Sequence, residues 1–194
     1  MHSRTAPALP LLIFMSAVAV LPVNMFVPSL PGIARDFSVD FALVNTAVAG
    51  SAIATAVVQL VAGALSDRWG RRPVALTAFA VFTLASVGCA LAGDIATFLL
   101  FRLLQGSVIA GYAVSLAVIR DTSDEYTATS RVGYVSSAWA VAPMVGPALG
   151  GVLDMCFGWR ASFVLFALLG LVGLWLIAFR LGETHLQRTA TLAA

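Results

Sequence analysis

Four charged side chains lie within six residues of the segment GALSDRWGRRPV, residues 63–74, although the sequence on both sides is almost entirely apolar. Two of them, Asp67 and Arg71, are four residues apart, a spacing at which opposite charges on one helix can pair. A carboxylate at this position could also lie near the positive N-terminus of a neighbouring helix. The segment therefore predicts either an ion-paired cluster or a basic loop that only fixes topology. The four charged residues are Asp67, Arg68, Arg71 and Arg72.

The glycines and the proline of this segment favour a structured connection between two helices. Gly63 would let the end of one helix approach a neighbouring helix closely. Gly70 would permit a tight turn, and Pro73 suits the first turn of the helix that follows. A basic loop alone would need neither this glycine spacing nor the aspartate.

Another arginine, Arg102, lies in the apolar stretch FRLLQGSVIAGY and has no charged neighbour in the sequence. An arginine at membrane depth costs from about 2.5 to more than 10 kcal/mol, so such residues face a cavity or a partner. Alternatively, the long side chain could reach the outer membrane interface. The sequence leaves both interpretations open.

The stretch APMVGPALGG, residues 142–151, combines helix-breaking and small residues. Pro143 and Pro147 each remove a helical hydrogen bond. Gly146, Gly150 and Gly151 allow close contact with another helix. We predict a bent helix with a packing seam of small residues.

Composition places the whole chain in a membrane. Of its 194 residues 60% are hydrophobic and 10% are charged, with a mean hydropathy of +0.97, whereas soluble domains have about 25% charged residues. Crossing a bilayer takes about 20 apolar residues. We therefore predict an all-α membrane protein with six transmembrane helices. The six windows are 9–27, 44–65, 74–91, 95–119, 132–153 and 163–179.

The predicted domain organisation is a short N-terminal segment at 1–8, the bundle at 9–181 and the start of a linker at 182–194. We interpret the first window as a retained helix, since it is long for a signal peptide and lacks a small-residue cleavage site. Arginine-rich connections stay in the cytoplasm. Eight arginines fall on one side and only Arg35 and Arg160 on the other, which predicts that both termini are cytoplasmic.

No pattern of catalytic residues emerges from the sequence. Cys89 and Cys156 lack metal-ligand spacing, so we expect apolar packing residues, and a disulfide between them stays open. The glycine runs lie in apolar helices and lack a P-loop lysine. We predict no enzyme activity, metal or cofactor, and a net charge of +2 gives no indication of nucleic-acid binding.

The charged segment resembles the loop 2–3 signature of the major facilitator superfamily, G-x-L-x-D-R-x-G-R-[KR]. The resemblance implies a gate that latches the two halves of a transporter in the outward-open state, with an acid at the end of helix 4. Arg102, Gln105 and Gly106 resemble the motif R-x-x-Q-G, in which the arginine serves proton coupling. The glycines and prolines of 142–151 resemble the helix 5 motif of antiporters. The implied gating residues are Gly63, Asp67, Arg68, Gly70, Arg71, Arg72 and Asp121.

NMFVPSLPGIARDF, VIRD and DMCFGWRASF make the chain most similar to the Bcr/CflA branch of drug–proton antiporters. That branch has an acid in helix 1 where this chain has Asn24, which could bond substrate or another helix's backbone. Tyr112 and Asn24 are the first candidates to line a substrate cavity. Further candidates, for which packing roles are favoured, are Asn45, Gln59, Tyr134 and Trp139.

The resemblance implies the N-terminal six-helix half of a twelve-helix, inner-membrane fold in which substrate binds between the halves. The expected function is proton-coupled efflux of small amphipathic drugs such as chloramphenicol by a half-length transporter. The alternative is a non-transporting half that acts only with a C-terminal half or a second copy. The expected partners are lipid, a small-molecule substrate and the proton.

Overall fold

A computed structural model describes residues 8–182 of the chain. The proposed N-terminal segment and linker therefore lie almost wholly outside the described residues. The described part contains six helical segments that are long and apolar enough to cross a membrane. This confirms the predicted all-α class and the six spans.

The boundaries differ from the prediction in two connections and in one span. The expected loop at 28–43 is largely helical, because Pro28 and Pro31 each occupy the first turn of a short helix. The expected loop at 120–131 is reduced to two residues, and the fourth span is divided near its middle. The elements are α1 (Leu9–Met25), η1 (Val27–Ser29), α2 (Leu30–Asp36), α3 (Phe41–Trp69), α4 (Arg71–Leu91), α5 (Ile95–Gln105), η2 (Gly106–Val108), α6 (Ile109–Thr122), α7 (Glu125–Phe157) and α8 (Arg160–Arg180).

Three aspartates outside the membrane spans begin helices. The side chain of Asp40 accepts the Ala42 N–H at 2.7 Å at the start of α3. Asp94 and Asp124 do the same for α5 and α7. N-cap bonds of this kind satisfy N–H groups that the first helical turn leaves without partners. The connections before α3, α5 and α7 thus end in defined helix starts.

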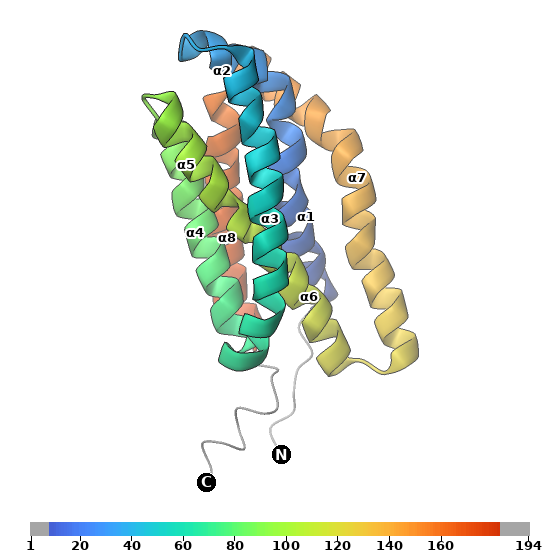
Figure 1. The fold of residues 1–194 in the computed structure, drawn as a ribbon. Helices are drawn as coiled ribbons and strands as arrows, with labels where there is room; N and C mark the ends of the chain where they lie inside the picture. The colour runs from blue at the N-terminus through green and yellow to red at the C-terminus, as the bar shows by residue number, and fades with distance from the viewer. Residues whose placement is uncertain (1–7, 183–194) are drawn as a thin grey trace.

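The bundle places corresponding connections at common ends. The α3–α4 turn, the α6–α7 connection, the start of α1 and the end of α8 lie at the lower end in Figure 1, and α2 lies at the upper end. Helix α4 packs along α8, and α1 packs along α7. Gly170 and Gly173 of α8 make the first contact possible, because a Cβ atom at either position would collide with α4.

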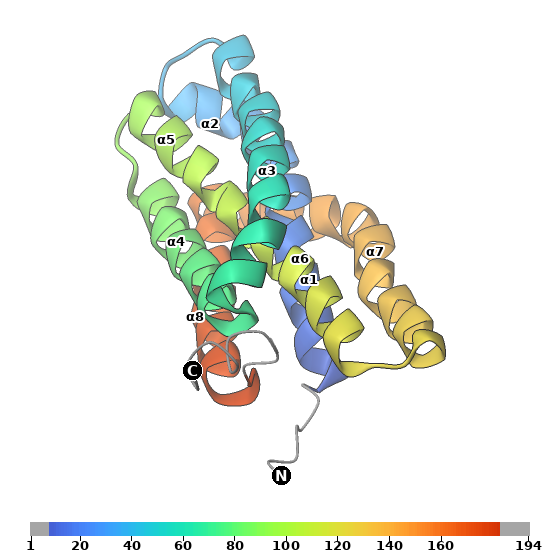
Figure 2. The same cartoon turned by 60° about the horizontal axis from the view of Figure 1, so that its bottom comes forward.

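The helices α3 and α7 are much less covered than the others. In their most apolar stretches only 11% and 17% of the residues are buried, against 39% to 61% in the other four spans. Helix α7 lies at the edge of the bundle beside α1 (Figure 2). Two of the six spans therefore have large faces that residues 8–182 leave uncovered.

Candidate functional site

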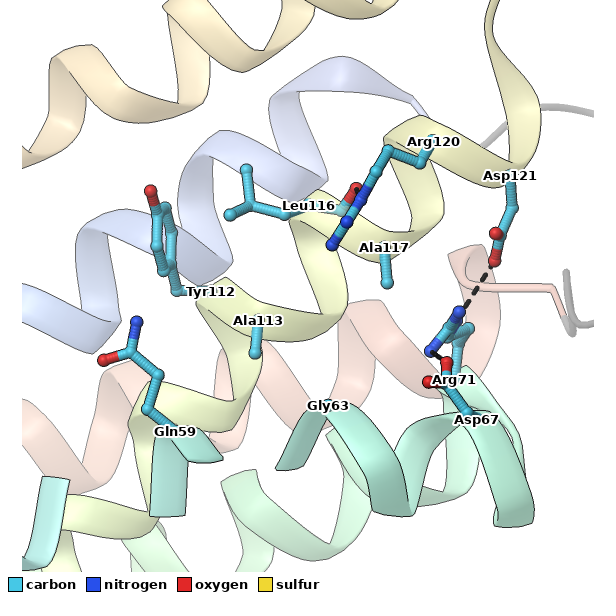
Figure 3. Close-up of a pocket in the computed structure, with 10 residues that line it drawn as sticks. All are labelled: Gln59, Gly63, Asp67, Arg71, Tyr112, Ala113, Leu116, Ala117, Arg120 and Asp121. Atoms are coloured by element: carbon cyan, nitrogen blue, oxygen red, sulfur yellow. Dashed lines mark hydrogen bonds and ion pairs between the residues drawn. The ribbon is translucent and has the colours of Figure 1, made fainter. Parts of the chain in front are cut away.

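Arg71 is the centre of the charged cluster at the α3–α4 connection. It is 7% exposed and forms an ion pair with Asp67, four residues earlier on α3. Its Nε donates to Asp121 Oδ2 at 3.0 Å, and an Nη donates to the Ser66 hydroxyl at 2.6 Å. Figure 3 shows Asp67, Arg71 and Asp121 pointing toward one another from three helices. The structure thus contains the expected pair and brings the expected helix 4 acid to it.

The neighbouring residues of the signature have different roles in the structure. Gly70 has φ +100°, a conformation that residues with a Cβ atom rarely adopt. Pro73 is the third residue of α4. Arg72 donates to the Ala178 carbonyl at 2.7 Å and so joins α4 to α8, whereas Arg68 is exposed. The turn and the helix start therefore have the predicted form.

The expected close approach at Gly63 is wrong for this chain. A Cβ atom at this position would have no heavy atom within 4 Å. Gly63 instead lines a cavity of about 390 Å³ between α3 and α6, which ends at the Arg71 cluster. The residue lacks a close neighbour because its helix faces this open space (Figure 3).

The cavity combines polar and aromatic side chains. Gln59 of α3 and Tyr112 of α6 lie opposite each other at one end, and Arg120 lies nearer to the charged cluster (Figure 3). The Tyr112 ring packs against Trp139 of α7, with ring centroids 4.8 Å apart. Three of the candidate lining residues are thereby brought together, and contact with a substrate stays a prediction. Asn45 and Tyr134 are exposed and do not line this cavity.

Arg102 is enclosed within the bundle and is 2% exposed. One Nη donates to Pro22 O of α1 at 2.7 Å, and the other donates to Gln105 Oε1. The guanidinium carbon lies 3.8 Å from the centroid of the Phe26 ring. Gln105 in turn donates to the Ser86 hydroxyl at 2.8 Å. The alternative of a side chain reaching the outer interface is wrong, because these partners hold it inside.

The motif around Arg102 also divides the fourth span. Helix α5 ends at Gln105, and the tighter turn η2 begins at Gly106 before α6 continues. A Cβ atom on Gly106 would lie 3.3 Å from Ala54 Cβ of α3. The glycine thus allows α3 to pack tightly where the span changes direction.

The glycines of α7 pack against the end of α1. A Cβ atom on Gly150 would lie 1.8 Å from the Met25 carbonyl oxygen, and one on Gly146 would lie 2.9 Å from Asn24 Cβ. Gly151 differs from the prediction, since its nearest contact, Pro28, would be at an ordinary 4.0 Å. It lies about 100° around the helix from Gly150.

Two further expectations concern α1 and α7. Asn24 donates to Val20 O of its own helix at 3.1 Å, rather than to another helix's backbone. Helix α7 is continuous through Pro143 and Pro147 and changes direction along its length (Figure 2). The change of direction agrees with the expected bend.

Sequence reasoning missed a second charged cluster, at the opposite end of the bundle. Asp36 accepts hydrogen bonds from Trp159 Nε1 at 2.8 Å and from Arg160 at 2.7 Å. Trp159 is only 4% exposed because it packs among Phe37, Phe98 and other rings. An aspartate and an arginine 124 positions apart give no local signal. A disulfide does not form, since both cysteines are free.

Comparisons with known proteins agree with this architecture. The family model described as Major Facilitator Superfamily matches residues 12–193. The chain is 35% identical over 165 residues to "Multidrug resistance protein MdtL" of Escherichia coli O81 (strain ED1a), which covers 84% of this chain and 42% of that relative. It thus spans less than half the length of the relative.

Two solved structures share the fold. The human organic anion transporter MFSD10 (TETRAN) has a TM-score of 0.74 at 20% identity and covers 91% of this chain and 47% of its own. A D-xylose-proton symporter has a TM-score of 0.77 at 17% identity and covers 95% of this chain and 50% of its own. By the match to the family model and this shared six-helix fold, the chain belongs to the Major Facilitator Superfamily.

Proposed function

We propose that the chain forms one wall of a drug–proton antiport pathway, and that a second six-helix unit forms the other wall. This unit is a C-terminal half or a second copy of the chain. The observation that carries the proposal is the exposure of α3 and α7, whose apolar stretches are only 11% and 17% buried. The name of the multidrug-resistance relative supports a drug substrate, and family membership agrees with a carrier rather than an enzyme.

Polar groups on the little-covered helices favour a protein partner over lipid alone. Gln59 of α3 lines the cavity that ends at Arg71, and Trp139 of α7 packs against Tyr112, which lines it too. Uncompensated polar groups facing hydrocarbon are costly, so such side chains usually face protein or a water-filled path. In this proposal the cavity is half of a substrate path, with Tyr112 among its contacts and Asn24 nearer the α1–α7 seam.

The proposed gate is the Arg71 cluster together with the turn at Gly70. In the cluster one guanidinium joins α3, α4 and α6 at the end of the cavity. A second unit that approached Gly63 would close this end of the path. The orientation proposed from the arginine distribution places this end in the cytoplasm of an inner-membrane protein. The bend of α7 would let the opposite end open and close.

Proton coupling is proposed to involve Arg102 and Gln105. Within residues 8–182 no carboxylate lies in the middle of a span, and Asn24 does not titrate. The group that exchanges a proton must then come from the gate carboxylates or from the second unit. Arg102 would transmit the change through its bond to α1. Replacing it by Ala is expected to abolish pH-driven export without preventing membrane insertion.

The test is efflux of ethidium and chloramphenicol from cells that express this chain alone or with a separately expressed C-terminal half. Each measurement is repeated with a proton uncoupler. Uncoupler-sensitive efflux only in the presence of the C-terminal half would support a two-part path, and efflux by the chain alone would indicate a second copy. Absence of efflux in both strains, despite normal membrane insertion, would contradict the proposal.

A further inference from the structure

A second cavity, of about 290 Å³, lies on the other side of α3, between α3 and α4. We call it the α3–α4 groove. Residues of an α-helix turn by about 100° each, so Val61 points away from Gln59 and Gly63, which face the first cavity. The two spaces are thus separated by α3 itself. The groove is lined mainly by Val57, Val61, Leu65, Trp69, Val74 and Val81.

The groove has the length of one leaflet. Val57 and Trp69 mark its extent along α3, and twelve residues of helix span about 18 Å. Half of a hydrocarbon core of about 30 Å is about 15 Å. Trp69 lies at the end of α3, beside the gate turn, and is 59% exposed. The groove therefore runs from this membrane surface to about the middle of the bilayer.

The chemistry of the wall favours a hydrocarbon chain over a drug. Its two hydroxyl groups already donate within the bundle, Thr77 to Pro73 O at 2.9 Å and Ser107 to Ala78 O at 3.2 Å. The other wall residues are apolar, apart from the indole of Trp69. Drug-binding pockets normally combine an apolar lining with polar groups that fix the ligand's orientation. This wall offers little to orient a polar ligand along its length.

The mouth of the groove is positively charged. Arg68 lies seven residues, about two helical turns, beyond Val61 on α3, so it continues the row of the groove wall to the membrane surface. It is exposed. Among the described residues, this end of the bundle has six arginines and four carboxylates, whereas the opposite end has two arginines and four carboxylates. Basic groups at the cytoplasmic surface attract anionic lipid headgroups.

We propose that the α3–α4 groove binds one acyl chain of an anionic phospholipid, whose phosphate lies at Arg68. The assignment to the cytoplasmic leaflet rests on the orientation in the proposed function. The lipid would border the α3–α4 turn directly, because Trp69 and Val74 flank the turn at Gly70. The membrane would thereby contribute a ligand to the wall of the proposed gate, on the side away from the transport cavity.

The test is native mass spectrometry of the purified full chain in detergent, with dioleoylphosphatidylglycerol or dioleoylphosphatidylcholine added. The two lipids share acyl chains and differ in headgroup charge. Val61→Trp would fill the groove with an indole. Leu60→Trp is the matched control, because Leu60 is the adjacent residue, is 82% exposed and does not line the groove. Arg68→Gln removes the headgroup contact and leaves the groove unchanged.

The expected result is one retained phosphatidylglycerol per chain, with weaker retention of phosphatidylcholine. Val61→Trp should lower retention at least tenfold and Leu60→Trp should not. Arg68→Gln should reduce the preference for phosphatidylglycerol by about fivefold, which corresponds to about 1 kcal/mol per basic residue. The proposal would be overturned if both tryptophan variants retained the lipid equally, or if the chain bound the two lipids with equal affinity. It would also be overturned if the chain bound ethidium and Val61→Trp abolished that binding. This experiment measures lipid binding and requires no transport, so its result does not depend on the outcome of the efflux experiment.

Discussion

The contact between α1 and α7 at Gly150 allows a quantitative test of the packing. A Cβ atom on Gly150 would lie 1.8 Å from the Met25 carbonyl oxygen, whereas real Cβ contacts essentially never fall below 3.0 Å. The obstacle is backbone rather than the end of a flexible side chain. In Gly150→Ala the two helices must therefore separate by more than 1 Å, or α1 must distort locally.

Two opposing terms decide the size of the effect. Alanine in place of glycine within a helix stabilises the helix by about 1 kcal/mol. Overpacking a close contact costs about 1–3 kcal/mol, and more where the neighbour does not move. Separating α1 from α7 would also loosen the contact of Gly146 with Asn24. We expect the cost to exceed the gain, with a net destabilisation of about 1–2 kcal/mol.

Gly151→Ala is the matched control, one residue away on the same helix. Its nearest contact would be 4.0 Å, an ordinary van der Waals distance, so only the gain in helix propensity should remain. Both variants are measured by reversible unfolding in mixed micelles, with the fraction inserted in the membrane as a control for expression. If Gly150→Ala unfolds at the same denaturant concentration as Gly151→Ala or at a higher one, the close approach of the two backbones is wrong.

Three further predictions concern the charged groups. Arg71→Gln leaves Asp67 and Asp121 without their shared cation and should destabilise the chain by about 1–2 kcal/mol. The loss should be smaller at high salt, which thermal unfolding in detergent at two salt concentrations would measure. Asp36→Asn removes a half-exposed ion pair and should cost about 0.5–1 kcal/mol in the same assay; an unchanged midpoint would contradict the contact. Hydrogen bonds from Thr97 lower the pKa of Asp94 below 3.8. The stability that the Asp94 charge contributes is therefore present above about pH 3.8 and is lost as the pH falls through the lowered pKa. Asp94→Asn should make hydrogen exchange in the first turn of α5 less dependent on pH in this range, and an unaltered pH profile would refute this.

The sequence predicts features that depend on neighbours along the chain. Asp67 and Arg71 are one helical turn apart, so their pairing follows from spacing. The turn at Gly70 follows from a glycine between two helical patterns. The six spans follow from windows of apolar residues that match the bilayer thickness. In each of these cases the physical constraint acts over fewer than about thirty residues.

Features that depend on the relative position of helices were not predictable in the same way. Gly63 and Gly150 are both glycines in apolar helices, yet one faces a cavity and the other touches a carbonyl oxygen. The bond from Trp159 to Asp36 joins residues 123 positions apart. Deciding between such alternatives requires the packing angles and the rotation of each helix about its axis.

The surroundings of Arg102 explain how a buried cation is accommodated without a carboxylate partner among residues 8–182. Hydrogen bonds to a charged group contribute about 1.5–3 kcal/mol each, and Arg102 makes two, to Gln105 and Pro22. The Phe26 face adds about 2 kcal/mol for a desolvated cation. Together these terms amount to about 5–8 kcal/mol, which is comparable with the cost of about 2.5 to more than 10 kcal/mol for an arginine at membrane depth. The Arg102 cation is therefore stabilised by neutral groups of α1 and α5. Asn24 bonds within its own helix, so in the proposed function α1 contributes no titratable group from this position.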